Sequence, residues 1–319
     1  MSQLHSFLLT SLLLLSLVSC SSDDFFHGED DSLQLLSFYD YWHSVDRIAL
    51  KKYSTLEVIH QSAARFGDYA FFIANGLESI SVYNLRTKKV VNTLSLEKND
   101  FKIYHCNQSS FGISKYLEDD LFPLLYVSQR AREDGRCFIE VLRIISSGSS
   151  FISGDTVLSI EKVQTIYLPK MTYENALGNA NCVIDLKNNR MITYSRNNNS
   201  FDDNYGDCRI SCFDIPNYKY KEVFLEDSDI RFSFTLECTA FNMQGACIVD
   251  NLLFIGQGYE SVGYILFNVV DLDSKQLLKQ FNLMSLGYSW EPEGCFYYDG
   301  SVMVASNTTI WRIDKKEYK

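Results

Sequence analysis

Short alternating apolar runs, separated by turn residues, cover most of the chain beyond residue 50, and two stretches are copies of one pattern. Residues 83–96 and 270–283 align without a gap, and each contains a strand end, a tight polar turn and an alternating strand. Two more apolar strands precede each copy, at 62–66 and 69–74 in the first and at 245–249 and 252–256 in the second. The repeated unit is therefore four short antiparallel strands, which is the size of one propeller blade.

Three weaker copies fit the same four-strand template. They run from Asn107 through 124–128 and 137–144 to 163–168, from Asn181 through 191–194 and 209–215 to 221–225, and from Glu293 through 302–306 to 309–313. The last copy ends one strand short. A strand at 53–59 precedes the first blade without a partner of its own, and it would supply the missing strand and close the ring.

The pattern therefore predicts an all-β fold, a β-propeller of five four-stranded blades whose ring is closed by an N-terminal strand. Six blades are an alternative, because the long segment 131–178 is difficult to divide, and a β-sandwich with extra strands is another. Little of the chain has a helical pattern. Residues 32–45 are aromatic and acidic, which favours either one short helix or an irregular strap.

The first nineteen residues differ from the rest. They contain no Lys, Arg, Asp or Glu, and Phe7 to Val18 are almost wholly apolar. This run is too short to span a bilayer stably and suits the core of a signal peptide. It ends at Ser19-Cys20, which resembles the bacterial lipobox, where a small residue precedes a cysteine that is lipidated before cleavage. The resemblance implies attachment to a membrane through lipid on Cys20, whereas an ordinary secretory signal is the alternative.

The residues after Cys20 indicate where the protein is sent. Ser21 does not resemble the Asp-type signal that retains lipoproteins at the inner membrane. The run Ser21-Ser22-Asp23-Asp24 resembles the export signal of surface-exposed lipoproteins in some Gram-negative groups, although a plain solvated tether explains it equally well. We therefore predict a signal peptide at 1–19, a lipidated acidic tether at 20–50 and one propeller domain at 51–319. The expected location is the outer membrane, facing outside.

Composition narrows the function classes. The formal net charge of −11 disfavours nucleic acids and other polyanions as partners. Eight cysteines follow Cys20, and an even number in an exported protein invites a disulfide framework. However, the chain is long enough to build a real core, and several cysteines lie in apolar strand patterns, so we expect buried, apolar-type cysteines. Cys208 and Cys212 would face the same side of a strand and lie too far apart to bridge each other.

A short polar signature precedes the innermost strand of each predicted blade. Because innermost strands line the channel of a propeller, the starts of these strands should converge at one mouth, where a small ligand or metal would bind. The candidate binding residues are His60, Gln61, His105, Asn107, Asn181, Gln244, Glu291 and Glu293. Polar residues at such positions also connect neighbouring blades by hydrogen bonds, and this is the alternative role for each of them.

Two of these signatures resemble one family. The run Gln244-Gly245-Ala246-Cys247 and the run at 291–294, Glu-Pro-Glu-Gly, resemble blade motifs of propellers similar to teichoic-acid biosynthesis protein C and phage receptor-binding proteins. The resemblance covers about the last quarter of the chain well. It implies a five-bladed propeller that holds cell-surface carbohydrate or acts as a platform, although the acidic charge argues against a phosphate-rich polymer. A weaker likeness is to propeller lipoproteins of unknown function on Gram-negative surfaces.

Three functions follow as hypotheses. The first is a surface propeller that binds a glycan or a partner protein without catalysis. The second is a propeller hydrolase, lyase or cyclase, in which His60, His105 and Glu293 act as a base or as metal ligands. The third is a structural component of an outer-membrane assembly. The sequence contains no Ser-His-Asp order, nucleophile elbow or phosphate loop, so no cofactor is expected besides the lipid, and a metal at the mouth stays an open alternative.

Overall fold

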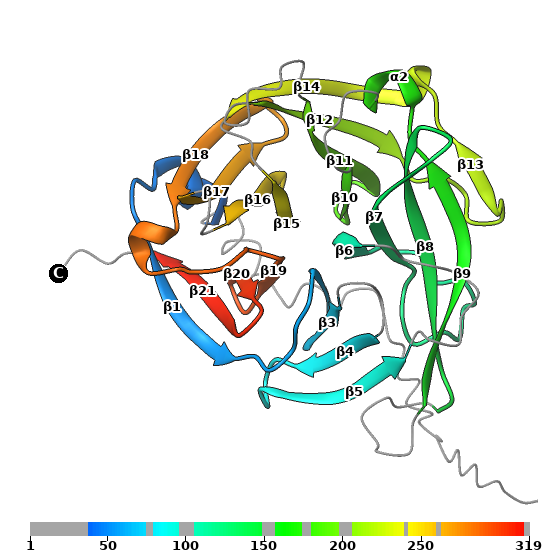
Figure 1. Ribbon diagram of the computed structural model, residues 1–319, viewed down its shortest axis with the longest axis horizontal. Coiled ribbons are helices and arrows are strands. Elements are labelled where there is room, and N and C mark those ends of the chain that lie inside the picture. Colours follow the sequence, from blue (N-terminus) through cyan, green and yellow to red (C-terminus); the bar gives the residue numbers. More distant parts are fainter. Residues whose placement is uncertain are drawn as a thin grey trace, which may run out of the picture.

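The protein is a ring of β-sheets arranged around one axis. The computed structural model describes residues 38–74, 79–95, 105–148, 157–173, 180–197, 206–238, 242–259 and 263–315. Within these ranges the strands form five sheets, each built mainly of four antiparallel strands. Figure 1 looks down the ring, with the first strands of the blades around the centre and the last strands at the rim. The predicted five-bladed propeller is confirmed.

The blades follow one another along the chain, with one exception at the point of closure. Blade 1 contains β2 (Ser62–Phe66), β3 (Tyr69–Ile73), β4 (Ser79–Asn84) and β5 (Lys89–Ser95), and blade 2 contains β6 (Cys106–Phe111), β7 (Leu125–Glu133), β8 (Arg136–Ser146) and β9 (Leu158–Tyr167). Blade 3 contains β10 (Asn181–Asp185), β11 (Arg190–Asn197), β12 (Gly206–Asp214) and β14 (Ile230–Cys238), and blade 4 contains β15 (Met243–Val249), β16 (Leu252–Tyr259), β17 (Tyr264–Asp271) and β18 (Gln276–Asn282). Blade 5 contains β19 (Gly294–Tyr298), β20 (Ser301–Ser306), β21 (Thr309–Lys315) and β1 (Ile48–Thr55).

The N-terminal strand closes the ring, as predicted. β1 pairs with β21 in antiparallel fashion, from Ile48 opposite Lys315 to Thr55 opposite Thr309. The closing strand lies earlier than the predicted 53–59, because the chain leaves the sheet after Thr55. Leu56 is buried in the core between blades 5 and 1, and its backbone N–H donates to the carbonyl of Thr308 (2.7 Å).

Blade 3 corrects one prediction. Its fourth strand is β14 and not the segment 221–225, of which residues Glu222–Phe224 form the short strand β13. β13 pairs in parallel with β9 of blade 2, where the ring of Phe224 stacks on Tyr167 with centroids 4.5 Å apart. Alternation of partly buried Phe232 and Phe234 with exposed residues marks β14 as a strand with one face against the core. The prediction missed that pattern.

The predicted alternative of a sixth blade is wrong. The segment 131–178 is long because β8 and β9 are long strands, of 11 and 10 residues, followed by the single-turn helix α2 (Lys170–Tyr173). Single-turn 3-10 helices also occur at Asp227–Asp229 (η2) and Met284–Leu286 (η4).

The described chain begins with a helix at 38–44 that packs on blade 4. Trp42 is 1% exposed and makes an edge-to-face contact with Phe254, with ring centroids 5.0 Å apart. The hydroxyl of Tyr39 donates to Asp271 Oδ2 (3.1 Å). Of the two predictions for 32–45, the short helix is therefore confirmed for residues 38–44. Residues 38–50, which the sequence assigned to the tether, pack as part of the propeller domain.

The repeated sequence pattern has a matching repeated structure. Both copies carry a β-bulge at the equivalent place, between Val82 and Tyr83 and between Val269 and Val270. In both tight turns a lysine adopts a left-handed conformation, with φ of 58° at Lys88 and 59° at Lys275. The sequence match therefore reflects one turn geometry used twice.

The apolar core is divided into five clusters among the described residues, one between each pair of neighbouring blades. Each sheet is buried on both faces, which explains the nearly continuous apolar strands. In β16, for example, Leu252 and Phe254 pack toward blade 5 whereas Leu253 and Ile255 pack toward blade 3. The wedge-shaped spaces between blades are thus filled by alternate residues of the same strands.

The cysteines behave as predicted. The seven whose side chains the structure describes are buried, and none of these seven is in a disulfide bond. Cys208 and Cys212 lie in the same cluster, on one side of β12. Among the described residues, no helix has the length and apolar character needed to cross a membrane. Cys20 and the signal segment lie outside the described residues.

Candidate functional site

The eight predicted site residues lie at one end of the ring, which we call the upper mouth. It is the end at which the innermost strands β2, β6, β10, β15 and β19 begin. Four of the residues are half-buried at this end: Gln61, His105, Asn107 and Glu291. The other four are buried: His60, Asn181, Gln244 and Glu293. All eight predicted residues thus lie at one end of the ring. Four of them are partly exposed there, and the other four are buried beneath the surface.

Two glutamates from the segment that enters blade 5 are each hydrogen-bonded to a neighbouring blade at the upper mouth. Gln61 Nε2, from blade 1, donates to Glu293 Oε1 (3.0 Å). Gln244 Nε2, from blade 4, donates to Glu291 Oε2 (2.7 Å). Each carboxyl group is therefore held by an amide from a neighbouring blade, and both side chains of this Glu-Pro-Glu run are fixed in position.

The two carboxyl groups differ in environment. Burial raises the pKa of Glu293 well above its ordinary range, and the neighbouring carboxyl group of Glu291 raises that pKa further. Glu293 Oε2 is buried, with no hydrogen-bond partner among the described residues. Burial therefore favours the protonated form of Glu293, which lies next to the half-buried side chain of Glu291.

His60 supports the mouth from below and does not lie on its surface. Its ring is completely buried and packs against Phe72, with centroids 4.6 Å apart. Nδ1 lies 3.0 Å from the carbonyl oxygen of Val58, so the tautomer with a proton on Nδ1 donates there. Burial lowers the pKa of His60 to about 4, which keeps the imidazole neutral.

The centre of the ring is closed by a side chain that crosses it. Gln108 on β6 of blade 2 donates from Nε2 to the carbonyl of Ala246 (2.8 Å) on β15 of blade 4, and its Oε1 accepts from the Ala246 N–H (2.9 Å). Blades 2 and 4 are not neighbours, so the fully buried Gln108 spans the middle of the propeller. Gln108 therefore joins two non-adjacent blades below the residues of the upper mouth.

Further hydrogen bonds join neighbouring blades below the surface. Asn181 Nδ2 donates to the carbonyl of Met243 (3.1 Å), and the hydroxyl of Tyr194 donates to the carbonyl of Gln244 (2.7 Å). Asn181, Gln244, Gln61 and Glu293 thus have the inter-blade role that the sequence left as the alternative. Gln108 and Tyr194 were not predicted as important. Gln108 lies in a polar run from Asn107 to Ser110, so the local sequence pattern did not distinguish it from its neighbours.

Gly245 is required because β15 and β19 approach each other very closely. A Cβ atom at this position would lie 2.7 Å from the carbonyl oxygen of Glu293 and 2.8 Å from the backbone nitrogen of Cys295. The Gly245 N–H donates to the carbonyl of Pro292 (3.0 Å). The Gln-Gly pair therefore brings blade 4 against the Glu-Pro-Glu-Gly run of blade 5.

Gly245→Ala is expected to lower the free energy of unfolding by about 3 kcal/mol, because the clash is with backbone atoms that cannot rotate away. Denaturant unfolding followed by tryptophan fluorescence measures the change. Gly300→Ala is the comparison, since a Cβ there meets open space and only the φ of 74° is unfavourable, at about 1–2 kcal/mol. Equal losses in the two variants would contradict the close approach at Gly245.

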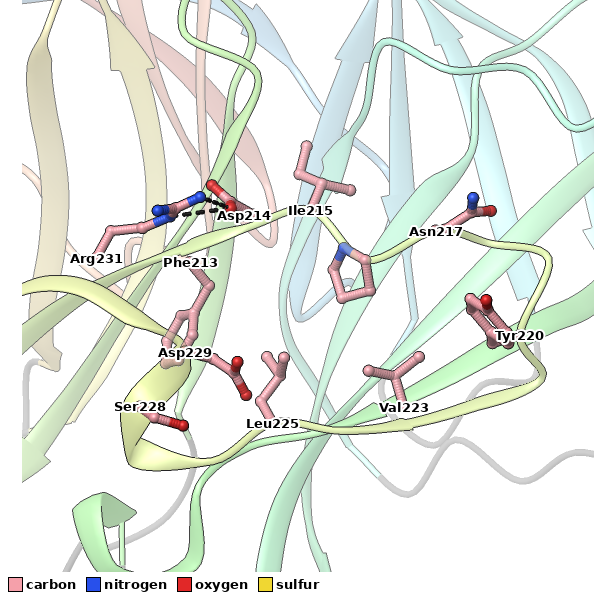
Figure 2. A pocket seen from close by; sticks show the side chains of 11 residues that line it. Phe213, Asp214, Ile215, Asn217, Tyr220, Val223, Leu225, Ser228, Asp229 and Arg231 are labelled. Carbon is pink, nitrogen blue, oxygen red and sulfur yellow. Dashed lines mark hydrogen bonds and ion pairs between the residues drawn. The ribbon is translucent and has the colours of Figure 1, made fainter.

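A separate pocket of about 470 Å³ lies at the opposite face, where β12 ends (Figure 2). All the residues that line it come from the segment 213–231: Phe213, Asp214, Ile215, Pro216, Asn217, Tyr220, Val223, Leu225, Ser228, Asp229 and Arg231. Two of its charged groups pair with each other, since Arg231 Nε donates to Asp214 Oδ2 (2.9 Å). Asp229 accepts the backbone N–H of Glu226 (2.8 Å). This pocket was not predicted from the sequence.

No group of three or more His, Cys, Asp or Glu side chains within the described ranges has the arrangement of a metal site. The residues best placed for chemistry are Glu291 and Glu293. A neutral carboxyl beside a carboxylate can donate a proton at one oxygen and accept a hydrogen bond at another, so the pair can bind hydroxyl groups or exchange protons with them.

Comparisons with known proteins give structural likeness alone. No family model and no curated protein matches the chain. Solved structures that resemble it include glutaminyl cyclase of Myxococcus xanthus (8% identity, TM-score 0.46, covering 85% of this chain and 99% of that one). The PQQ-bound aldose sugar dehydrogenase of Streptomyces coelicolor has the same values. A protein of unknown function from Bacteroides caccae follows at 9% identity and TM-score 0.38, covering 76% and 69%. These scores carry no argument about function, and the resemblance to the teichoic-acid protein C family stays a prediction.

Proposed function

We propose that this protein is an exported lipoprotein whose propeller binds a neutral, hydroxyl-rich glycan at the upper mouth without catalysis. Lipid on Cys20 attaches it to the outer membrane, facing outside. The observation that supports the binding role is a group of four half-buried polar residues at one end of the ring, Gln61, His105, Asn107 and Glu291. Beneath them Gln108 bridges blades 2 and 4. A ligand would rest on this surface and not pass through the ring.

The chemistry of the mouth favours hydroxyl groups as ligands. A sugar hydroxyl both donates and accepts, and the mouth offers amide donors from Gln61 and Asn107 and a carboxylate acceptor at Glu291. The raised pKa of Glu293 favours the protonated form of that second carboxyl group, which can then donate a hydrogen bond. The mouth has the donors and acceptors for a polyol, whereas the carboxylate and the net charge of −11 oppose a phosphate-rich polymer.

Calorimetric titration of the full chain against a panel of neutral oligosaccharides tests this proposal. We expect one member of the panel to bind, and Glu291→Gln to weaken that binding roughly 10-fold or more, because a hydrogen bond to a charged acceptor is lost. Gln61→Ala should weaken binding roughly 3- to 10-fold.

Tyr220→Ala, in the pocket of the opposite face, is the matched control and should leave the affinity unchanged. Loss of binding in Tyr220→Ala, with normal binding in both mouth variants, would show that the ligand binds in the pocket of the opposite face. That result would contradict this proposal. Failure of every oligosaccharide, together with capture of a protein by the upper mouth, would replace the glycan by a partner protein.

One observation favours an enzyme as the second candidate. Glu293, neutral, and Glu291, with its half-exposed carboxylate, have the split environments typical of a general acid and a general base. Analysis of the oligosaccharides after incubation separates the two functions. Unchanged oligosaccharides support binding alone, whereas products that disappear in Glu293→Gln support a hydrolase, lyase or cyclase.

Cys20→Ser is expected to abolish membrane attachment. The serine hydroxyl does not accept the diacylglycerol that the cysteine thiol takes, and each buried CH₂ of the lipid contributes about 0.8 kcal/mol to anchoring. Labelling of expressing Gram-negative cells with a clickable fatty acid, followed by membrane fractionation, measures both effects. Cys182→Ser, at a buried core position, should stay labelled. A lipid label that persists in Cys20→Ser would contradict the anchor.

A further inference from the structure

We propose that Cys247 and Cys295 form a disulfide bond between blades 4 and 5 when the protein meets a thiol oxidant. Their sulfur atoms lie 3.3 Å apart in the reduced protein. Both residues are buried, at 8% and 2% exposed. A disulfide bond of about 2.05 Å therefore requires the two sulfur atoms to approach by little more than roughly 1 Å. The inference stands on this geometry and does not depend on what the upper mouth binds.

The contact between the two sulfurs follows from the close approach of two innermost strands. Gly245 lets β15 pack against the backbone of β19, and its N–H donates to Pro292 (3.0 Å). Cys247 lies two residues beyond Gly245, and Cys295 lies two residues beyond Glu293. Because side chains two apart in a strand share a face, both thiols point into the same narrow space between the blades.

Another buried cysteine, Cys106, contacts a hydroxyl group of the neighbouring blade. Its thiol lies 2.8 Å from the hydroxyl of Ser62, and this contact joins β6 to β2. A serine hydroxyl cannot be crosslinked to a thiol by oxidation. The contact of Cys247 with Cys295 joins β15 to β19 in the corresponding way, with a partner that can be oxidised.

The reaction needs a disulfide-bearing oxidant, such as a thiol–disulfide oxidoreductase of an oxidising compartment. Cys247 is the more exposed of the two residues and is therefore the one that an oxidant reaches first. Cys247 loses a proton and attacks one oxidant sulfur, and the other oxidant sulfur leaves as a thiolate. Cys295 then loses a proton and attacks the Cys247 sulfur, which releases the second thiolate. Two electrons and two protons pass to the oxidant, and one sulfur–sulfur bond forms.

The disulfide bond would link blades 4 and 5 covalently below the upper mouth. Gln244 Nε2 donates to Glu291 Oε2 between blades 4 and 5 at the mouth, and Cys247 and Cys295 lie further along the chain in the two strands β15 and β19. A disulfide there removes conformational freedom from the unfolded chain and so raises the midpoint of thermal unfolding by roughly 5–10 °C.

The test uses the full chain, reduced, then incubated folded with oxidised glutathione, denatured and alkylated. We expect a protein lighter by two hydrogen atoms before alkylation, and a crosslinked proteolytic peptide that contains residues 247 and 295. The unfolding midpoint should rise on oxidation of the natural chain and should not rise in Cys247→Ser. Cys182→Ser, in another core cluster, should keep both the crosslink and the rise.

Free alkylation of both thiols after oxidation would overturn the proposal, as would glutathione retained on Cys247 without transfer to Cys295. A crosslinked peptide that joins other cysteines, or a rise in midpoint that persists in Cys247→Ser, would also overturn it. Should Cys247→Ser fail to fold, Cys247→Ala provides the same comparison with a residue that suits an apolar interior.

Discussion

Glu293→Gln is expected to make the protein more stable than the natural chain at neutral and alkaline pH. Burial raises the pKa of Glu293 well above its ordinary value, with a smaller contribution from Glu291. At low pH the carboxyl group is protonated in both the folded and the unfolded chain, so the glutamine and the acid differ little. As the pH rises above the ordinary value of about 4.3, the unfolded chain releases this proton while the folded chain keeps it.

The natural chain therefore loses stability relative to Glu293→Gln by up to about 1.4 kcal/mol for each pH unit, until the pH passes the raised pKa of the folded state. Gln keeps the acceptor oxygen that Gln61 uses at 3.0 Å, so the fold should be preserved. Denaturant unfolding at several pH values between about 5 and 8 measures the difference.

Glu57→Gln is the control, because Glu57 is exposed and the substitution should add no pH-dependent difference in this range. The comparison of variant with natural chain also removes the contribution of His60, which has the opposite sign: its lowered pKa, about 4, makes the protein lose stability as the pH falls below about 6.5. A difference between Glu293→Gln and the natural chain that is the same at every pH would show that the buried carboxyl is ionised in the fold.

The protonation of Glu293 bears directly on the proposed site. With a neutral Glu293, the upper mouth carries the half-exposed carboxylate of Glu291 and a second carboxyl group that can donate a proton in a hydrogen bond. Such a surface complements hydroxyl groups better than a pair of carboxylates would, since two adjacent charges would repel each other and attract cations. The same measurement therefore tests both the proposed binding chemistry and the acid–base alternative.

Trp42→Ala is expected to lower the free energy of unfolding by about 3–5 kcal/mol. Trp42 is 1% exposed, lies in the core cluster between blades 4 and 5, and contacts Phe254 and Phe267. Truncation leaves a cavity beneath the segment that leads into the closing strand β1. Thermal and denaturant unfolding of the full chain measure the loss.

Trp290→Ala is the matched control, because Trp290 is 53% exposed and its removal should change stability far less. Equal effects of the two substitutions would contradict the assignment of residues 38–44 to the propeller domain. A large effect of Trp42→Ala would instead confirm that the packed domain begins well before residue 51, and it would shorten the stretch available as a tether after Cys20.

Several features could be predicted because they depend on local pattern. The blade repeat was visible at 83–96 and 270–283 because a tight turn fixes residue types at set spacings, and the structure shows the same bulge and the same left-handed lysine in both copies. The fourth strand of blade 3 was missed because the apolar segment 221–225 precedes β14. That segment pairs with β9 of another blade, and pairing between blades has no trace in a local pattern.

The sequence by itself was enough to predict five blades, with six as an alternative, closure by an N-terminal strand and the end of the ring at which eight polar residues lie. These follow from strand periodicity and from the order of strands in a blade. The roles of the residues at the mouth were decided by the tertiary structure alone. Burial of Glu293 and His60, the bridge of Gln108 across the ring and the contact of Cys247 with Cys295 all arise between strands far apart in the chain. Burial and distance set the protonation and reactivity of such groups, and both are properties of the assembled ring.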